Sequence, residues 1–203
     1  MIATVKGQTM TEEREQKDRL RMTLLGRRKK IATRDRCIWN SDIGLNLLRL
    51  PEYIAADKVL IYLSTPWEVS TKIPIAHAMG VGKTVAVPRW GEGRMEFCHF
   101  TDYSLLTPGR KGILQPTPGV PVLEDMSNAI CIVPALAADL HGMRIGYGGG
   151  YYDRFLESFG GTSVILAYDS MVKVSLPNEP HDLPVNIIIT QSEVIRVNKG
   201  DNL

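Results

Sequence analysis

The sequence predicts an α/β fold, namely a three-layer α/β/α domain with a mainly parallel central sheet and an N-terminal helical segment. Three observations support this prediction. Five short apolar runs rich in β-branched residues are typical of strands that are buried on both faces. Helical segments lie between several of these runs, which is the order that a parallel sheet requires. Ahead of the first run, residues 11–32 are rich in helix-forming residues and contain no proline.

The predicted elements follow one another without an internal repeat or a low-complexity linker. Helices are expected over about 11–32, 33–49, 70–80 and 150–158, the second of them ending before Pro51. Strands are expected over residues 58–64, 84–88, 129–134, 162–168 and 186–190. The polarity of residues 94–100 alternates, which predicts an antiparallel strand. We therefore expect a single domain over residues 11–203, preceded by a flexible tail over residues 1–10.

Composition argues against several classes of protein. The net charge of the 203 residues is only +2, which is too small a bias to make nucleic acid the main partner. No apolar run approaches the ~18 residues of a membrane-spanning helix, and the N-terminal residues lack the apolar core of a signal peptide. The three cysteines lie far apart, as expected for buried thiols in a reducing compartment. We expect a cytoplasmic monomer with no membrane partner.

The stretch GMRIGYGGGYYDRF, at residues 142–155, has the strongest functional pattern in the chain. Its five glycines follow a predicted strand and lead into a predicted helix, and ligands of such sheets bind beyond the carboxyl ends of the strands. Glycines allow backbone N–H groups to surround an anion, while Arg144 offers a guanidinium fork for phosphate oxygens. The alternative is an ordinary glycine-rich loop. The stretch matches neither the Walker A pattern nor the dinucleotide-binding fingerprint, so it indicates a polyphosphate but names no reaction.

Several segments, in order along the chain, resemble one known family. The segment VPALAADLHGMRIGYGGGYYDRFL (133–156) is the most specific, and the others are KDRLR (17–21), YLSTPWEVST (62–71), GILQP (112–116) and PHDLPVNIIIT (180–190). Together they resemble the 5-formyltetrahydrofolate cyclo-ligase family, also called methenyltetrahydrofolate synthetases, over nearly the whole chain from Lys17. Two residues depart from the family pattern: Ala135 stands where glycine is common, and Ala138 where phenylalanine is common. We expect these departures to alter the shape of the pocket while removing no charged group.

The resemblance implies an enzyme that uses ATP and magnesium to convert 5-formyltetrahydrofolate to 5,10-methenyltetrahydrofolate, with release of ADP and phosphate. In this reaction the formyl oxygen takes the γ-phosphoryl group, and ring closure then expels phosphate. Such chemistry depends mainly on positioning and on stabilisation of phosphoryl charge. Two alternatives remain: a non-catalytic nucleotide- or folate-binding protein on the same fold, and an ATP-dependent ligase for a related one-carbon compound.

The resemblance also implies the residues that bind ATP. Lys17 and Arg21 are spaced four residues apart and therefore share one face of the predicted helix. The other implied ATP-binding residues form one continuous segment: Arg144, Ile145, Gly146, Tyr147, Gly148, Gly149, Gly150, Tyr151 and Tyr152. Arg14 and Arg28 continue the basic stripe of the helix and are interpreted as solvated residues.

For the folate, the resemblance implies contacts with Leu63 and with Glu68, whose carboxylate would hold the N–H donors of the pterin ring. The loop residues shared with ATP complete this set: Tyr147, Gly148, Gly149, Gly150 and Tyr151. Taken without the resemblance, Glu68 is an exposed loop charge. Trp67 and Trp90 either add aromatic surface to the site or are ordinary packing residues.

Asp153 and Asp182 are the magnesium ligands that the resemblance implies, in keeping with the preference of this hard ion for carboxylates and phosphates. Without the resemblance, Asp153 is a candidate cap of the following helix and Asp182 a turn residue. The four histidines have no metal-type spacing, which argues against zinc. A catalytic cysteine–histidine pair is a further alternative, although the spacing of the cysteines and histidines gives no indication of one.

Overall fold

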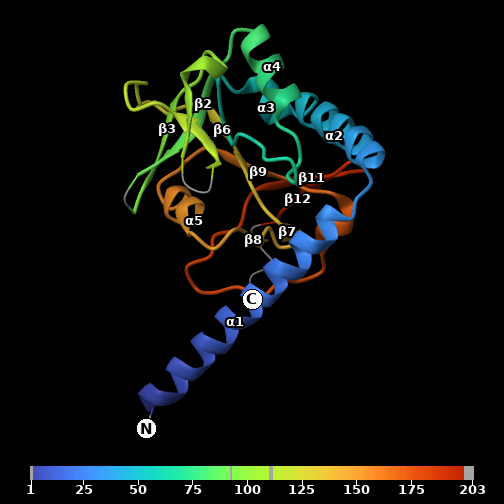
Figure 1. Cartoon of the computed structure of the whole chain (residues 1–203), viewed down its shortest axis with the longest axis vertical. Coiled ribbons are helices and arrows are strands. Elements are labelled where there is room, and N and C mark those ends of the chain that lie inside the picture. The colour runs from blue at the N-terminus through green and yellow to red at the C-terminus, as the bar shows by residue number, and fades with distance from the viewer. Residues whose placement is uncertain (1, 92, 110–111, 199–203) are drawn as a thin grey trace.

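The computed structural model describes residues 2–91, 93–109 and 112–198, with side chains described from residue 15 onward within these ranges. A central sheet is built from β1 (Lys58–Ile61), β2 (Thr84–Trp90), β3 (Met95–His99), β6 (Ala129–Val133), β9 (Thr162–Leu166), β11 (Ile187–Ile189) and β12 (Val194–Arg196). The order of these seven strands is β12-β11-β9-β6-β1-β2-β3 (Figure 1). The inner strands are parallel, while β3 and β12 pair antiparallel at the two edges. The predicted, mainly parallel sheet is therefore confirmed.

Helices cover both faces of this sheet. They are α1 (Ile2–Lys29), α2 (Thr33–Leu48), α3 (Pro51–Ala55), α4 (Lys72–Gly80) and α5 (Tyr151–Leu156). Successive strand residues point to opposite faces, so Val59 of β1 packs in one hydrophobic cluster with Ile43 of α2 and Ile75 of α4. Its neighbour Leu60 belongs to the second cluster, against which Phe155 of α5 packs. Figure 1 shows α5 apart from α2, α3 and α4 across the sheet, and the three-layer α/β/α prediction is confirmed.

The ends of the predicted elements differ in detail from those observed. α1 begins at Ile2 instead of near residue 11. α3 is not predicted by the sequence analysis, because Pro51 ends the preceding helical pattern. The same proline begins a new helix, where its missing N–H leaves no hydrogen bond unmade. Among the described helices, none has the length and apolar character needed to cross a membrane.

Short strands outside the central sheet also lie beyond the prediction. They are β4 (Leu106–Pro108), β5 (Leu114–Pro116), β7 (Ala137–Asp139), β8 (Arg144–Ile145) and β10 (Val172–Lys173), and short 3₁₀ helices cover Tyr103–Leu105 and Asp169–Met171. Strands of two or three residues are too short to show a period in polarity. The turn between β7 and β8 is held by the buried Asp139 carboxylate, which accepts the backbone N–H groups of His141 and Met143. This turn leads directly into the glycine-rich segment.

The topology determines where a ligand can bind. β1 and β6 are neighbours in the sheet, but the chain continues from β1 to β2 on one side and returns to β6 on the other. A crevice beyond the carboxyl ends of two such strands is the usual ligand site of an open α/β sheet. Residues 62–71 follow β1 at this point and residues 134–150 follow β6. The two segments that carry the predicted folate and ATP residues therefore meet at one edge.

Candidate active site

A pocket of about 900 Å³ lies beyond the carboxyl ends of β1 and β6. Every residue that the sequence analysis assigns to ATP, folate or metal lines it, including Lys17 and Arg21 from α1, Glu68 after β1 and the whole segment 144–153. Trp67 and Trp90 line it as well. A smaller cavity of about 530 Å³, bordered by Phe159 and other residues, contains none of the predicted site residues. The structure thus brings together residues that are up to 165 positions apart in the chain.

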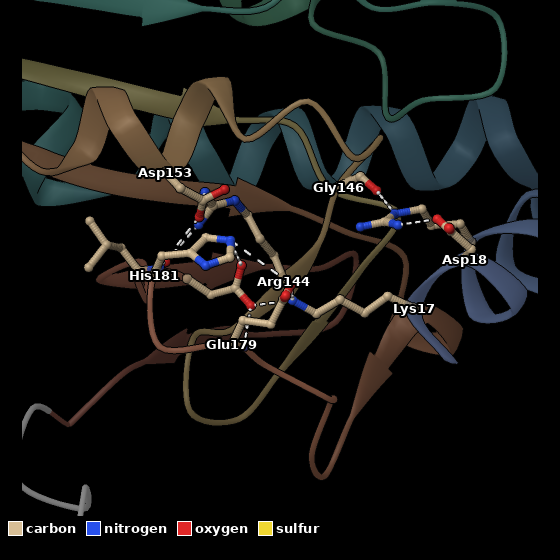
Figure 2. A network of polar contacts seen from close by, with 10 residues as sticks. Lys17, Asp18, Arg144, Gly146, Asp153, Glu179 and His181 are labelled. Carbon is tan, nitrogen blue, oxygen red and sulfur yellow. Dashed lines mark hydrogen bonds and ion pairs between the residues drawn. The ribbon is translucent and has the colours of Figure 1, made fainter. Parts of the chain in front are cut away.

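The α1 wall of the pocket carries two basic side chains, as its four-residue spacing predicts. Lys17 is only 3% exposed, and its Nζ donates to Glu179 Oε2 at 2.7 Å and to Asp182 Oδ2 at 2.5 Å. Arg21 Nε donates to the carbonyl oxygen of Gly146 at 3.0 Å, and Arg21 Nη1 pairs with Asp18. Figure 2 shows Lys17 extending from α1 toward Glu179, with Gly146 and Asp18 at the two ends of the contacts that Arg21 makes. α1 is therefore attached to the glycine segment and to the loop that carries Asp182.

The glycine segment requires its glycines at two positions. Gly148 and Gly150 have φ angles of +86° and +63°, a region that other residues rarely adopt. A Cβ atom on Gly148 would also lie 3.4 Å from the guanidinium carbon of Arg21. The helix that follows, α5, has only six residues and is shorter than the predicted helix over 150–158, so its dipole adds little positive potential. Backbone N–H groups and the neighbouring arginines are the groups that remain to bind an anion.

Asp153 pairs with an arginine and does not cap α5. Arg144 Nη2 donates to Asp153 Oδ1 at 2.6 Å, and Arg144 Nη1 donates to the carbonyl oxygen of Leu183 at 2.6 Å. The Leu183 N–H also donates to Asp153 Oδ1, at 3.4 Å. The N-cap of α5 is Gly150, which makes no side-chain capping bond. The helix-cap alternative for Asp153 is therefore wrong, and the carboxylate links the glycine segment to the loop that carries Asp182.

Asp182 belongs to a small group of possible metal ligands. Ligand atoms of Glu179, His181 and Asp182 all lie within 4.8 Å of one another. Asp153 lines the same pocket but is not a member of this group. Figure 2 shows Glu179 and His181 on the same side of Lys17. Sequence reasoning missed Glu179 and His181, although an acidic residue three positions before Asp182 in a proline-rich loop is a signal that could have found the first of them.

The pocket also contains a buried carboxylate after β1, and tyrosines of the glycine segment line it. Glu68 is 7% exposed, and its Oε2 accepts the Thr65 N–H at 2.7 Å. The interpretation of Glu68 as an exposed loop charge is therefore wrong. Burial, and next the Glu68 carboxylate, raise the pKa of Tyr147 above its ordinary value. Burial also raises the pKa of Tyr152, whose hydroxyl oxygen is buried and has no hydrogen-bond partner among the described residues.

Arg28 overturns part of the sequence analysis. Its side chain is 1% exposed, not solvated, and it donates a hydrogen bond to the carbonyl oxygen of Ala135. The helix turns this residue toward the sheet, next to Leu24 in the core, because four residues make just over one turn. The side chain of Arg14 lies outside the described side chains.

The two alanines that depart from the family pattern do not line the pocket. Ala135 and Ala138 are buried in the hydrophobic cluster beneath α5. The predicted effect on the shape of the pocket therefore has to pass through the residues that pack on these alanines.

Comparisons with known proteins lead to one family. The model of the 5-formyltetrahydrofolate cyclo-ligase family matches residues 13–191. The chain is 30% identical over 155 residues to the 5-formyltetrahydrofolate cyclo-ligase of Escherichia coli strain K12, covering 73% of this chain and 85% of that protein. Over 145 residues it is 32% identical to the protein of the same name from Haemophilus influenzae, covering 68% and 78%. The solved structure of Aquifex aeolicus 5,10-methenyltetrahydrofolate synthetase has 29% identity and a TM-score of 0.80, covering 92% of this chain and 95% of that chain.

Proposed function

The chain belongs to the 5-formyltetrahydrofolate cyclo-ligase family, and from this premise we propose that it uses Mg-ATP to cyclise 5-formyltetrahydrofolate to 5,10-methenyltetrahydrofolate. One observation carries the proposal: a single pocket combines a basic, glycine-lined wall with a second wall that carries the buried Glu68 carboxylate. Phosphates need the first of these walls, and a ring with N–H donors needs the second. The two substrates must touch during the reaction, so both walls belong in one cavity.

ATP would lie against α1 and the glycine segment. Lys17 and Arg21 supply positive charge from the helix, and Arg144 supplies it from β8. Gly148 and Gly150 adopt conformations that allow their neighbours' N–H groups to approach phosphate closely. Charge-assisted contacts of this kind contribute roughly 1.5–3 kcal/mol each. The proposed ATP-binding residues therefore form a continuous surface.

Magnesium fits the carboxylates of this pocket. The proposed ligands are Asp153 and Asp182, and Glu179 joins them because its carboxylate lies within 4.8 Å of Asp182. The ammonium of Lys17 lies between Glu179 and Asp182, so these two carboxylates already hold a cation in this structure. When bound, magnesium would offset the negative charge that develops on the transferred phosphoryl group.

The folate would be held with its pterin ring at Glu68 and its formyl group toward the glycine segment. The Glu68 carboxylate accepts N–H donors from the ring, and the loop residues Tyr147 to Tyr151 complete the folate contacts. In the proposed reaction the formyl oxygen takes the γ-phosphoryl group and ADP leaves. The N10 amine then attacks the formyl carbon, loses its proton, and expels phosphate as the ring closes. The protein contributes position and charge.

The test is direct. Purified protein is mixed with Mg-ATP and 5-formyltetrahydrofolate, and the absorbance of the methenyl product is followed over time. We expect product to form in proportion to the enzyme, with one ADP released per ring closed. A folded protein that binds both ligands but forms no product would establish the alternative of a non-catalytic binding protein. Product from another one-carbon substrate, with none from 5-formyltetrahydrofolate, would establish the third alternative.

We further infer that this enzyme acts as a cytoplasmic monomer and that residues 11–203 form its single domain. The small net charge of +2 supports a protein whose ligands are small molecules. Light scattering of the purified protein measures its mass in solution, and a mass of two or more chains would contradict the monomer.

A further inference from the structure

We propose that Lys17 and Arg144 act as internal counterions of the metal-binding carboxylates and are transferred to the phosphates when Mg-ATP binds. The inference rests on the proposed function and concerns how the same site takes up its ligands. In this view the metal and the nucleotide bind strongly only together. Glu179, which neither the sequence nor the family resemblance assigns, becomes part of the metal site.

The first pair is formed by Lys17. Its ammonium contacts Glu179 Oε2 at 2.7 Å and Asp182 Oδ2 at 2.5 Å. The side chain of Lys17 is only 4% exposed. These two carboxylates also belong to the group whose ligand atoms lie within 4.8 Å of one another. A lysine ammonium is a compact point charge on a flexible stem. Lys17 thus occupies the position between the carboxylates that a small cation would take.

The second pair repeats this arrangement on the glycine segment. Arg144 Nη2 contacts Asp153 Oδ1 at 2.6 Å, and the exposed fractions of the two side chains are 5% and 20%. Figure 2 shows both pairs in one view, with Arg144 and Asp153 close to the group around Glu179. In each pair a proposed phosphate-binding cation neutralises a proposed metal-binding carboxylate. Because two separate ion pairs combine the same two proposed roles, we infer that both pairs exchange partners when Mg-ATP binds.

The charges explain why the ligands should bind together. A free metal ion must displace the ammonium of Lys17 and leave that ammonium buried without a partner, which is costly. Free ATP draws Lys17 and Arg144 toward its phosphates and leaves the carboxylates uncompensated. When both ligands arrive, each cation meets phosphate and each carboxylate meets metal, so no buried charge is left unpaired. The free energies of the two binding events are therefore coupled.

The coupling can be measured without turnover. Mn²⁺ replaces Mg²⁺, and free Mn²⁺ is determined by electron paramagnetic resonance during titration of the wild-type protein, with and without a non-hydrolysable ATP analogue. The Mn²⁺ that the analogue binds without protein is measured in the same way and subtracted. We expect the analogue to tighten Mn²⁺ binding by about tenfold or more, within the usual range of coupling between sites. Equal Mn²⁺ affinity with and without the analogue would overturn the proposal, and this measurement needs no variant to fold.

Two substitutions at one position identify the counterion. Lys17→Gln removes the competing charge, so Mn²⁺ should bind this variant about tenfold more tightly than wild type when no nucleotide is present. Lys17→Arg keeps the charge and should bind Mn²⁺ as weakly as wild type. Circular dichroism checks that both variants fold. If folded Lys17→Gln binds Mn²⁺ no better than wild type, the exchange is refuted.

Glu179 has its own test. Glu179→Gln should weaken Mn²⁺ binding in the presence of the nucleotide analogue, whereas Glu15→Gln, on an exposed part of α1, should not change it. Equal Mn²⁺ affinity in the two variants would remove Glu179 from the metal site. These outcomes are separate from the proposed reaction: absence of methenyl product with the coupling intact would refute the reaction alone, and product without coupling would refute the counterion exchange alone.

Discussion

Asp153→Asn removes the charge that faces Arg144 while keeping the size of the side chain. The ion pair joins Arg144 Nη2 to Asp153 Oδ1 at 2.6 Å, and the same oxygen accepts the Leu183 N–H at 3.4 Å. Asparagine can still accept a hydrogen bond at this place. It cannot balance the charge of the Arg144 guanidinium, and the Arg144 side chain is only 5% exposed to solvent.

The expected loss follows from this geometry. Charge-assisted hydrogen bonds contribute roughly 1.5–3 kcal/mol, and the partial exposure of Asp153 limits the loss to about 2 kcal/mol. For a protein of this size each kcal/mol lowers the melting temperature by roughly 2–4 °C, so the variant should melt about 4–8 °C below wild type. The sequence alone would predict almost no change, since asparagine caps helices as well as aspartate does.

Differential scanning calorimetry without ligands checks this value. The matched control is Glu15→Gln, which breaks an ion pair with Arg19 at 3.1 Å whose side chains are 61% and 81% exposed. We expect this control to change the stability by less than about 0.5 kcal/mol. If both variants melt at the wild-type temperature, the Arg144–Asp153 pair does not contribute to stability as the structure suggests.

In the activity assay, Asp153→Asn should also need more magnesium, and full activity at low magnesium would contradict the assignment of Asp153 as a metal ligand.

Three further substitutions test other parts of the site. Glu68→Gln should weaken folate binding and leave nucleotide binding nearly intact in calorimetric titrations, because one acceptor becomes a donor; equal losses would assign Glu68 to the fold. Arg21→Ala should raise the apparent KM for ATP about tenfold through loss of a charge-assisted contact, and an unchanged KM would assign Arg21 to a structural bond with Gly146 only. Arg28→Ala should cost about 2 kcal/mol in urea unfolding, because it removes the buried hydrogen bond to the Ala135 carbonyl oxygen and leaves a cavity. The exposed neighbour Arg27 is the control, and equal effects of Arg27→Ala and Arg28→Ala would contradict the buried position.

The central sheet could be predicted because its strands are short, apolar and bounded by turns. The run at residues 129–134 contains only buried positions in β6, so its composition alone indicates a strand covered on both faces. β7, β8 and β10 have two or three residues each, and their pairing depends on tertiary contacts that no local pattern records. The start of α3 at Pro51 could not be predicted either, because a proline at this position is equally expected after the end of a helix and at the beginning of the next one.

In the candidate site too, some features could be predicted from local sequence patterns and others could not. The spacing of Lys17 and Arg21 predicts a shared helix face, and both residues line the pocket. The basic stripe could not reveal that Arg28 turns inward, because charge alone does not tell which face of a helix meets the core. Glu179 lies in a polar loop without a period, and its role depends on Lys17, 162 positions away. Sequence patterns identify local elements well and long-range partners of charged residues poorly.

The connection of α1 to the far end of the chain also has a consequence for biosynthesis. Lys17 emerges from the ribosome long before residues 179 and 182, whose carboxylates neutralise it in the folded protein. Contacts between such distant residues form late and slowly, because a long loop must close first. During translation the basic side of α1 is therefore accessible to other anions, and the proposed nucleotide wall is completed only after residues 179–182 have been released. The proposed phosphate site therefore cannot form from the N-terminal part of the chain alone.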